Sequence, residues 1–346
     1  MVEWVPFAAG AVPEAIAALP KVNLHTHLEG SVRPTTVIEL AQAQGIRLPL
    51  PAGQVAAAMQ VSGRESSLAD YLERVRFVQP VLKDAVALRR VAREAAEDQA
   101  HDHVRYLELR AGPAIHVTRR LPVEDVIAAI LAGLADAEAQ TGITCRFIVA
   151  ALRHDPPQVN VELAHAAVAF RGRGVVGFDL AGDEAAYPAH LHREAFAVAR
   201  AGGLGITVHA GEAGGADAVR YAVCELGATR IGHGVRAIDD PNTVRLLAER
   251  RVTLEICPTS NVHTHAVSSI TAHPLPHFLT QGVPVTIGDD DPVTSQTRVS
   301  QELALIGREF GLPLETLRAL QVMGLQASFL EDEARRAALL AEMQAP

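Results

Sequence analysis

Two histidines close to the start of the chain are spaced for metal binding. His25 and His27 lie in the segment Asn23-Leu24-His25-Thr26-His27, at the end of an apolar run. On a β-strand, residues i and i+2 point to the same face, so the two imidazoles would project together. Imidazole is the commonest protein ligand of metals, and a neighbouring pair suits one ion. Such a pair also arises by chance or on a surface, so the other residues must decide.

Further reactive side chains follow other apolar runs. His209 and Glu212 come at the end of one run, His233 ends the next, and three aspartates, 289–291, follow the last. In barrels of alternating strands and helices, active sites lie at the carboxyl ends of the strands. A random scatter of polar residues would not select strand ends so consistently. The pattern therefore predicts one metal site shared by several strands.

The donor types suggest which metal. His25, His27 and His209 offer three imidazoles, and one aspartate of the last run offers a carboxylate. Nitrogen and oxygen donors without a thiolate suit Zn²⁺, with Fe²⁺, Mn²⁺ and Co²⁺ as alternatives. A water on such an ion has its pKa lowered to about 7, which supplies hydroxide at neutral pH. The only lysines are Lys21 and Lys83, so no lysine is available to bridge two metals on a middle strand, which favours one ion.

Two residues are candidates for proton transfer. Glu212 follows His209 closely and is placed to move protons between water and substrate. Its alternative interpretation is a carboxylate that stabilises a helix N-terminus. His233 would accept a proton or orient the hydroxide, and its alternatives are a fourth metal ligand or a core histidine.

The elements that must position these residues are parallel strands. The chain contains eight nearly continuous Val, Ile and Leu runs, a pattern typical of strands buried on both faces. The predicted strands are Val22–Leu28, Val104–Leu109, Thr144–Leu152, Val175–Leu180, Gly205–Ala210, Arg230–Val235, Val252–Cys257 and Val283–Gly288. Ala-rich helical segments separate them, for example Pro122–Gln140, Pro188–Ala201, Ala216–Leu226, Asp240–Arg250 and residues 301–343. We therefore predict an α/β fold, a single (β/α)8 TIM-type barrel domain over residues 1–346 with extra C-terminal helices.

The alternation is broken once. Between the first two predicted strands lie helical patterns at Thr35–Gln44, Ser67–Gln79 and Asp84–His101, without a strong strand. This predicts a helical insertion, about residues 34–101, above the mouth of the barrel. It would form part of a lid or, alternatively, a packing subdomain.

Composition excludes several classes of partner. The chain has 346 residues and a net charge of −9, which argues against nucleic-acid binding and against docking on anionic membranes. The segment 256–288 has no charged residue, but four prolines interrupt it, so we predict buried loops and strands there, not a membrane span. Three scattered cysteines indicate a reducing compartment. Glu3 and the lack of a basic residue before Lys21 argue against a signal peptide, so a cytoplasmic location is expected. The sequence predicts no oligomeric state.

Taken together and in order, these motifs resemble the adenosine deaminase family of the amidohydrolase superfamily, from Lys21 to about residue 330. The segments that carry the resemblance are residues 21–31 (KVNLHTHLEGS), 179–184 (DLAGDE), 209–212 (HAGE), 231–234 (IGHG), 257–261 (CPTSN) and 290–292 (DDP). The resemblance implies a zinc-dependent hydrolase that replaces the amino group of a 6-aminopurine nucleoside. The implied ligands of one Zn²⁺ per chain are His25, His27, His209 and Asp290.

The resemblance also implies roles for the remaining residues. Glu212 would protonate purine N1, His233 would orient and deprotonate the attacking water, and Asp291 would bind N7. The backbone of Gly182 would meet N3, Glu29 would face the sugar, and His27 would contact the substrate as well as the metal. The expected supporting groups are Asp179 and Glu255, the latter as the partner of His233.

This chain departs from the family pattern at two places. Three consecutive aspartates leave Asp289 as a rival of Asp290 for the metal, with Pro292 favouring Asp290. Glu29 stands where adenosine-specific members usually carry Asp. Gly182 and Gly232 have the form seen in nucleoside deaminases, so adenosine or 2′-deoxyadenosine is the predicted substrate. The alternatives are aminodeoxyfutalosine, an intermediate of menaquinone biosynthesis, and free adenine.

Overall fold

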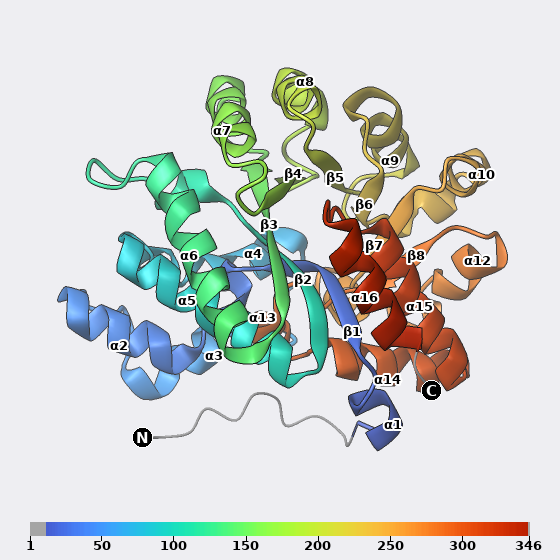
Figure 1. Cartoon of the computed structure of the whole chain (residues 1–346), viewed down its shortest axis with the longest axis horizontal. Helices are drawn as coiled ribbons and strands as arrows, with labels where there is room; N and C mark the ends of the chain where they lie inside the picture. The colour runs from blue at the N-terminus through green and yellow to red at the C-terminus, as the bar shows by residue number, and fades with distance from the viewer. Residues whose placement is uncertain (1–11, 345–346) are drawn as a thin grey trace.

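The strands form a barrel in which each strand pairs in parallel with the next. A computed structural model describes residues 12–344, and its sheet order is β1 to β8 (Figure 1). The strands are β1 (Lys21–His27), β2 (Val104–Ala111), β3 (Thr144–Leu152), β4 (Val175–Ala181), β5 (Gly205–Ala210), β6 (Arg230–His233), β7 (Thr253–Ile256) and β8 (Val285–Ile287). The predicted eight-stranded barrel is confirmed, with β3 and β5 at the predicted bounds.

The ring closes at the residues predicted to bind metal. Thr26 and Asp290 form a parallel bridge between β1 and the segment after β8. The backbone N–H of His27 donates to the carbonyl of Asp290 at 2.7 Å, and that of Asp290 donates to the carbonyl of His25 at 3.0 Å. The backbone hydrogen bonds that close the barrel therefore also fix the position of Asp290.

Helices cover the outside of the barrel (Figure 1). The described residues form α1 (Glu14–Ala17), α2 (Pro34–Gln44), α3 (Val55–Met59), α4 (Leu68–Arg76), α5 (Ala85–His101), α6 (Val123–Thr141), α7 (Pro157–Ala169), α8 (Arg193–Ala201), α9 (Ala216–Tyr221), α10 (Pro241–Glu249), α11 (Pro258–His263), α12 (Leu275–Thr280), α13 (Pro292–Ser295), α14 (Val299–Phe310), α15 (Leu314–Ala327) and α16 (Glu333–Gln344). Several bounds follow from end signals in the sequence. Asp84 caps α5 by accepting the Ala87 N–H, and α6 ends at Gly142, whose φ of +77° suits only glycine well.

Some predicted helices differ from the observed ones. The segment Ala216–Leu226 is α9 followed by a π-helical turn over Ala222–Leu226, and α8 starts only at Arg193 after a 3-10 turn. The uncharged segment 256–288 was predicted as loops and strands, which is incomplete, because α11 and α12 also lie there. Both begin with a proline near the first position, which helix N-termini tolerate.

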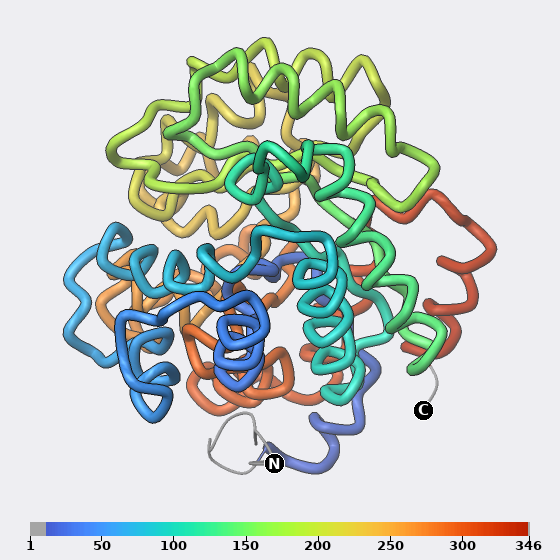
Figure 2. Tube along the Cα trace, turned by 90° about the vertical axis from the view of Figure 1, so that its left-hand side faces the viewer, coloured from blue at the N-terminus to red at the C-terminus, as the bar shows by residue number. Residues whose placement is uncertain are grey.

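The insertion between β1 and β2 contains two kinds of helix. α5 packs along α6 and β2, so it takes the place of an ordinary barrel helix. The additional helices are α2, α3 and α4, which Figure 2 shows in blue on one side of the molecule. At the other end of the chain, α15 and α16 pack against β1 through Leu325, Leu339 and Met343.

Within residues 12–344, no helix is both long and apolar enough to cross a membrane. Glu3, on which the argument against a signal peptide rests, lies outside the described residues, as do the other residues of 1–11 and 345–346. The single domain over 1–346 and the cytoplasmic location stay predictions.

Candidate active site

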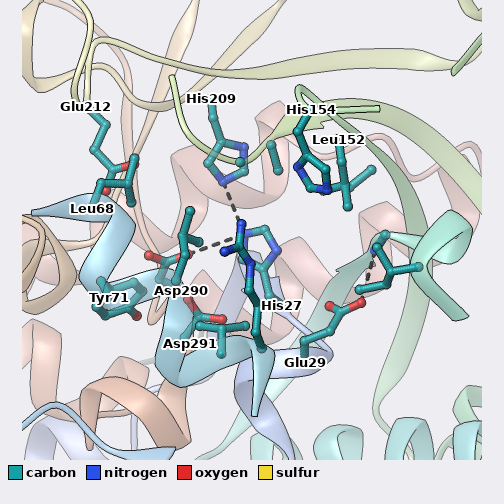
Figure 3. A pocket seen from close by; sticks show the side chains of 18 of the residues that line it. His27, Glu29, Leu68, Tyr71, Leu152, His154, His209, Glu212, Asp290 and Asp291 are labelled. Carbon is teal, nitrogen blue, oxygen red and sulfur yellow. Dashed lines mark hydrogen bonds and ion pairs between the residues drawn. The ribbon is translucent and has the colours of Figure 1, made fainter. Parts of the chain in front are cut away.

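The four residues predicted to hold a metal lie together at the carboxyl end of the barrel. His25 and His27 end β1, His209 is on β5, and Asp290 follows β8. One ligating atom of each lies within 4.8 Å of those of the others. His27 Nε2 is 3.1 Å from His209 Nε2 and 3.4 Å from Asp290 Oδ1 (Figure 3). The structure thus brings all four predicted ligands together.

The hydrogen bonds around this cluster leave lone pairs pointing at its centre. His25 Nδ1 is 2.9 Å from Glu255 Oε2, and His209 Nδ1 is 3.0 Å from Asp179 Oδ2. Because ionised carboxylates only accept hydrogen bonds, each Nδ1 carries the ring proton and each Nε2 offers a lone pair. His25 Nε2 has no hydrogen-bond partner and faces Asp290 Oδ1 at 3.2 Å. Electron-rich atoms so close together could hold a cation between them, and three imidazoles with one carboxylate fit zinc.

Two buried arginines hold the carboxylates that orient the histidines. Arg110 donates to Asp179 Oδ2 at 3.0 Å and to Glu255 Oε2 at 2.8 Å, and Arg230 donates to Glu255 Oε1 at 2.7 Å. Burial alone would raise the pKa of Glu255, but the two guanidinium groups hold it well below its ordinary value. Burial acts likewise on Asp179, whose pKa the neighbouring His209 and Arg110 lower. Both carboxylates therefore stay ionised and fix the ring orientations.

One predicted contact of this group is wrong. Glu255 was expected to partner His233, yet its carboxylate binds His25. The reason is register, because Glu255 pairs with Gly232 and so points into the barrel below His25. His233 lies one residue further along β6, and its Nδ1 is 3.0 Å from the amide nitrogen of Asn261.

The three aspartates after β8 are separated by their surroundings. Asp289 turns away from the cluster and accepts hydrogen bonds from Asn23 and Gln99, both at 2.7 Å. Asp290 places Oδ1 among the histidines, while its Oδ2 accepts the Ser260 hydroxyl at 2.6 Å. Asp290, not its rival Asp289, is therefore the residue placed as a ligand. Its φ of +59° is unusual for a residue with a side chain, as is common at functional sites.

Glu212 is buried beside the cluster with an unused oxygen. Its Oε2 is 3.5 Å from His233 Nε2, and its Oε1 has no hydrogen-bond partner. Burial, reinforced by the charge of Asp290, raises the pKa of Glu212 to about 8. This carboxyl is therefore protonated at neutral pH and able to donate a hydrogen bond or a proton.

Glu184, which the sequence analysis gave no role, fixes the loop that carries Glu212. Its carboxylate accepts four backbone N–H groups, those of residues 211–214, at 2.8 to 3.0 Å. A side-chain carbon on Gly214 would lie 2.6 Å from Glu184 Oε1, so only glycine fits there without a shift. The position of Glu212 is thus imposed by a neighbouring loop.

Asp291 and Glu29 line the same cavity as Glu212 and lie across it from the Glu212 carboxyl (Figure 3). Burial and the charge of Asp290 raise the pKa of Asp291 well above its ordinary value, and its Oδ1 has no hydrogen-bond partner. A side-chain carbon on Gly30 would lie 1.8 Å from that oxygen, so glycine makes room for it. Glu29 Oε1 lies 2.9 Å from His116 Nε2 and accepts the backbone N–H of Gly112 at 3.1 Å.

The cavity contains about 770 Å³ of empty space, including solvent at its mouth. This is within the usual size range of small-molecule sites. Gly182 lines it, as do Leu68, Tyr71 and Leu72 of α4, so part of the insertion forms one wall of the site. The prediction that the insertion acts as a lid is not decided by this arrangement.

Comparisons with known proteins agree with this geometry. The sequence profile of the adenosine deaminase family matches residues 20–346. The chain is 39% identical over 343 residues to an adenosine deaminase of Mycobacterium sp. (strain KMS), with 94% of each protein covered. Its fold is similar to adenine deaminase from Arthrobacter aurescens (TM-score 0.87, 28% identity, 94% of this chain and 98% of that one). It is also similar to an amidohydrolase from Burkhoderia ambifaria with bound Zn (TM-score 0.87, 29% identity, 98% and 96%). The chain therefore belongs to the adenosine deaminase family and is a hydrolase that acts as a deaminase.

Proposed function

We propose that this deaminase is zinc-dependent and converts adenosine or 2′-deoxyadenosine and water to inosine or 2′-deoxyinosine and ammonia. The observation that carries the proposal is a pair of buried carboxyls facing one cavity beside the metal cluster. Glu212 Oε1 and Asp291 Oδ1 both lack a partner, and burial raises the pKa of both groups. Neutral carboxyls donate hydrogen bonds, and adenine offers acceptors at N1 and N7 on either side of its amino-bearing carbon C6.

The metal ligands in this proposal are His25, His27, His209 and Asp290, with one zinc per chain. When bound, zinc supplies a water acidified enough to react at neutral pH. The chain's own residues do the rest. Glu212 protonates N1 and makes C6 electrophilic, and His233 orients the attacking water beside it.

Two further residues orient the purine in this proposal. Asp291 holds N7, and the backbone of Gly182 meets N3. Together with Glu212 at N1, these contacts read three ring nitrogens of a purine. Water adds at C6, the bond from C6 to the amino nitrogen breaks, and ammonia leaves.

The far end of the cavity supports a nucleoside over a nucleotide. Glu29 Oε1 is held by His116 and Gly112, while no described residue bonds to Oε2. A carboxylate oxygen accepts hydrogen bonds from sugar hydroxyls and repels a phosphate. Arg76 also lines the cavity, but its guanidinium pairs with Glu73. Glu29 is one methylene longer than Asp, and its contact with His116 fixes the end of the longer side chain.

The test is release of ammonia by the zinc-loaded protein with five substrates in parallel. These are adenosine, 2′-deoxyadenosine, adenosine 5′-monophosphate, adenine and aminodeoxyfutalosine. The proposal predicts the highest kcat/KM for adenosine or its 2′-deoxy form. Preference for aminodeoxyfutalosine, adenine or the nucleotide would contradict it and move the assignment to that substrate. The variant Glu29→Gln should lower kcat/KM for adenosine about tenfold and weaken discrimination against the nucleotide.

A further inference from the structure

A directed chain of hydrogen bonds ends at His233. The backbone N–H of Leu275 donates to His273 Nδ1 at 3.1 Å. His273 Nε2 is 3.2 Å from Asn261 Oδ1, and Asn261 Nδ2 is 3.0 Å from His233 Nδ1. All three side chains are buried, with exposed fractions of 0 to 4%. None of the roles described so far uses His273 or Asn261.

The direction of this chain is set at its first link. A backbone N–H can only donate, so His273 Nδ1 accepts. Burial lowers the pKa of His273 to about 4, so its ring is neutral at pH 7 and carries its one proton on Nε2. That N–H donates to Asn261 Oδ1, which turns the amide NH2 of Asn261 towards His233 Nδ1. Since the NH2 group only donates, His233 Nδ1 accepts, and a proton there would face another donor.

We infer that His273 and Asn261 are positioning residues that keep the ring proton of His233 on Nε2, the nitrogen that faces the cavity. The inference rests on the proposed function for its catalytic meaning. His233 Nε2 is 3.5 Å from Glu212 Oε2, so this N–H points to the region beside Glu212 in which the proposed function places the attacking water. His233 therefore holds the water oxygen as a hydrogen-bond donor and is not the base. This revises the role that the family resemblance implied for His233.

The proton balance of the reaction closes without a base at His233. Glu212 gives its proton to N1, which keeps it in the product. The carboxylate formed takes up one proton of the water and is restored, and the other proton leaves with ammonia. Each proton thus passes through Glu212 or the departing amino group.

The substitution Asn261→Asp would reverse the direction of the hydrogen bond to His233 Nδ1. A carboxylate only accepts, so it would draw the ring proton of His233 to Nδ1 and turn Nε2 into a lone pair or make the ring cationic. In serine proteases, the catalytic histidine donates its Nδ1–H to an aspartate. Replacing that aspartate by asparagine gives the wrong tautomer of the histidine and lowers kcat by about 10⁴. Asn261→Asp therefore changes one atom and tests the proton position directly.

The experiment combines two readouts, the first on both the zinc-free and the zinc-loaded protein and the second on the zinc-loaded protein alone. The first is ¹⁵N NMR of the imidazole nitrogens of His233, assigned by their loss in His233→Gln. The second is kcat and KM for adenosine. We expect Nε2 to carry the proton in the wild type. In Asn261→Asp we expect Nδ1 to be protonated and kcat to fall at least 100-fold, with KM changed less than threefold.

Two variants of His273 test the first link of the hydrogen-bond chain, and a variant of Asn160 serves as the control. His273→Leu removes the donor to Asn261 and should lower kcat about tenfold, while His273→Gln keeps an N–H donor and should restore part of it. The matched control is Asn160→Asp, because Asn160 Nδ2 is likewise 3.0 Å from a histidine Nδ1, that of His192, outside the cavity. Its kcat should stay within threefold of the wild type.

The outcomes separate this inference from the proposed function. A wild-type His233 with its proton on Nδ1, or an Asn261→Asp variant with wild-type kcat, would overturn the inference. If Asn261→Asp does not fold, the wild-type spectrum and the two His273 variants decide. A wild type that shows the proton on Nε2 but deaminates no purine nucleoside would contradict the proposed function and leave the proton position as inferred.

Discussion

At the scale of residues, the site separates four buried carboxyls into two kinds. Asp179 and Glu255 contact arginine and histidine, which lower their pKa values against the effect of burial. Among the described residues, no arginine or lysine pairs with Glu212 or Asp291, and only His233 lies near Glu212, at 3.5 Å, so burial and the nearby carboxylate of Asp290 raise their pKa values. The ionised pair orients the histidines, and the protonated pair faces the cavity. All four carboxyls are buried, so the difference in their pKa values comes from the charged groups beside them.

Replacing Glu212 tests its task as proton donor. Glu212→Gln keeps the shape of the side chain but cannot transfer a proton, so kcat should fall about 10²- to 10⁴-fold. Zinc content and KM should stay within about threefold of the wild type. The exposed carboxyl Glu225 gives the control, since Glu225→Gln should change neither constant. Loss of zinc from Glu212→Gln would instead make this residue a ligand.

The pair of neighbouring aspartates tests the assignment of the carboxylate ligand. Asp290→Asn should weaken zinc binding at least 100-fold, because Asp290 Oδ1 lies among the histidines. Asp289→Asn should still bind one zinc per chain, because the Asp289 carboxylate turns away from the histidines and accepts hydrogen bonds from Asn23 and Gln99. Competition with a chelator measures both. Equal weakening in the two variants would contradict the assignment.

At the scale of elements, the site depends on loops that other loops hold in place. Glu184, which follows β4, binds the backbone of the loop after β5 and so fixes Glu212. Glu184→Ala removes four hydrogen bonds and should lower kcat about 10- to 100-fold with little change in KM, since small misplacement of a reacting group is costly. Glu184→Gln keeps an oxygen acceptor and should lose less. Asp183→Asn, in the same turn, is the control. An unchanged kcat in Glu184→Ala would show that the loop after β5 keeps its conformation without Glu184.

The loop between α3 and α4 makes a prediction about pH. The Glu65 carboxylate accepts from the Ser62 backbone and from Arg74, and these contacts lower its pKa to about 2 although burial opposes this. The unfolded value is higher, so the unfolded state binds more protons at low pH. The stabilisation is complete above pH 4.5 and is lost as the pH falls through about 2.

Glu65→Gln should therefore reduce the free energy of unfolding by about 2 kcal/mol at pH 6 and by less than half as much at pH 3. Urea unfolding at both pH values measures this difference. Glu73→Gln, on the exposed surface of α4, should show no such dependence. A constant difference between wild type and Glu65→Gln at the two pH values would disprove the role of ionisation.

At the scale of the whole molecule, sequence patterns predicted the barrel because its strands lie in short runs rich in Val, Ile and Leu that end in polar residues. The same strand ends predicted the histidines and one aspartate of the last run, and the family resemblance selected Asp290 among the three. Patterns of this kind say little about single polar residues whose partners are distant in sequence. Arg110 on β2 meets Glu255 on β7 only because the barrel brings the two strands around one axis.

Other misses have the same physical cause. Asn261 lies in a recognised motif, but its contact with His233 depends on the fold bringing α11 close to the end of β6. The expected pairing of Glu255 with His233 failed on a shift of one residue in strand register. The short helices of the uncharged segment lack the length needed for a clear periodic signal. The sequence thus predicted which residues form the site better than which residues support them.

The most direct test of the whole account is a titration of the metal-free protein with zinc while inosine formation from adenosine is followed. The account predicts negligible activity without metal and a linear rise that stops at one zinc per chain. Asp290→Asn should show no rise over the same range, and Asp289→Asn should follow the wild type. Full activity without metal, a break at two zinc ions per chain, or no inosine at one would contradict a one-zinc adenosine deaminase.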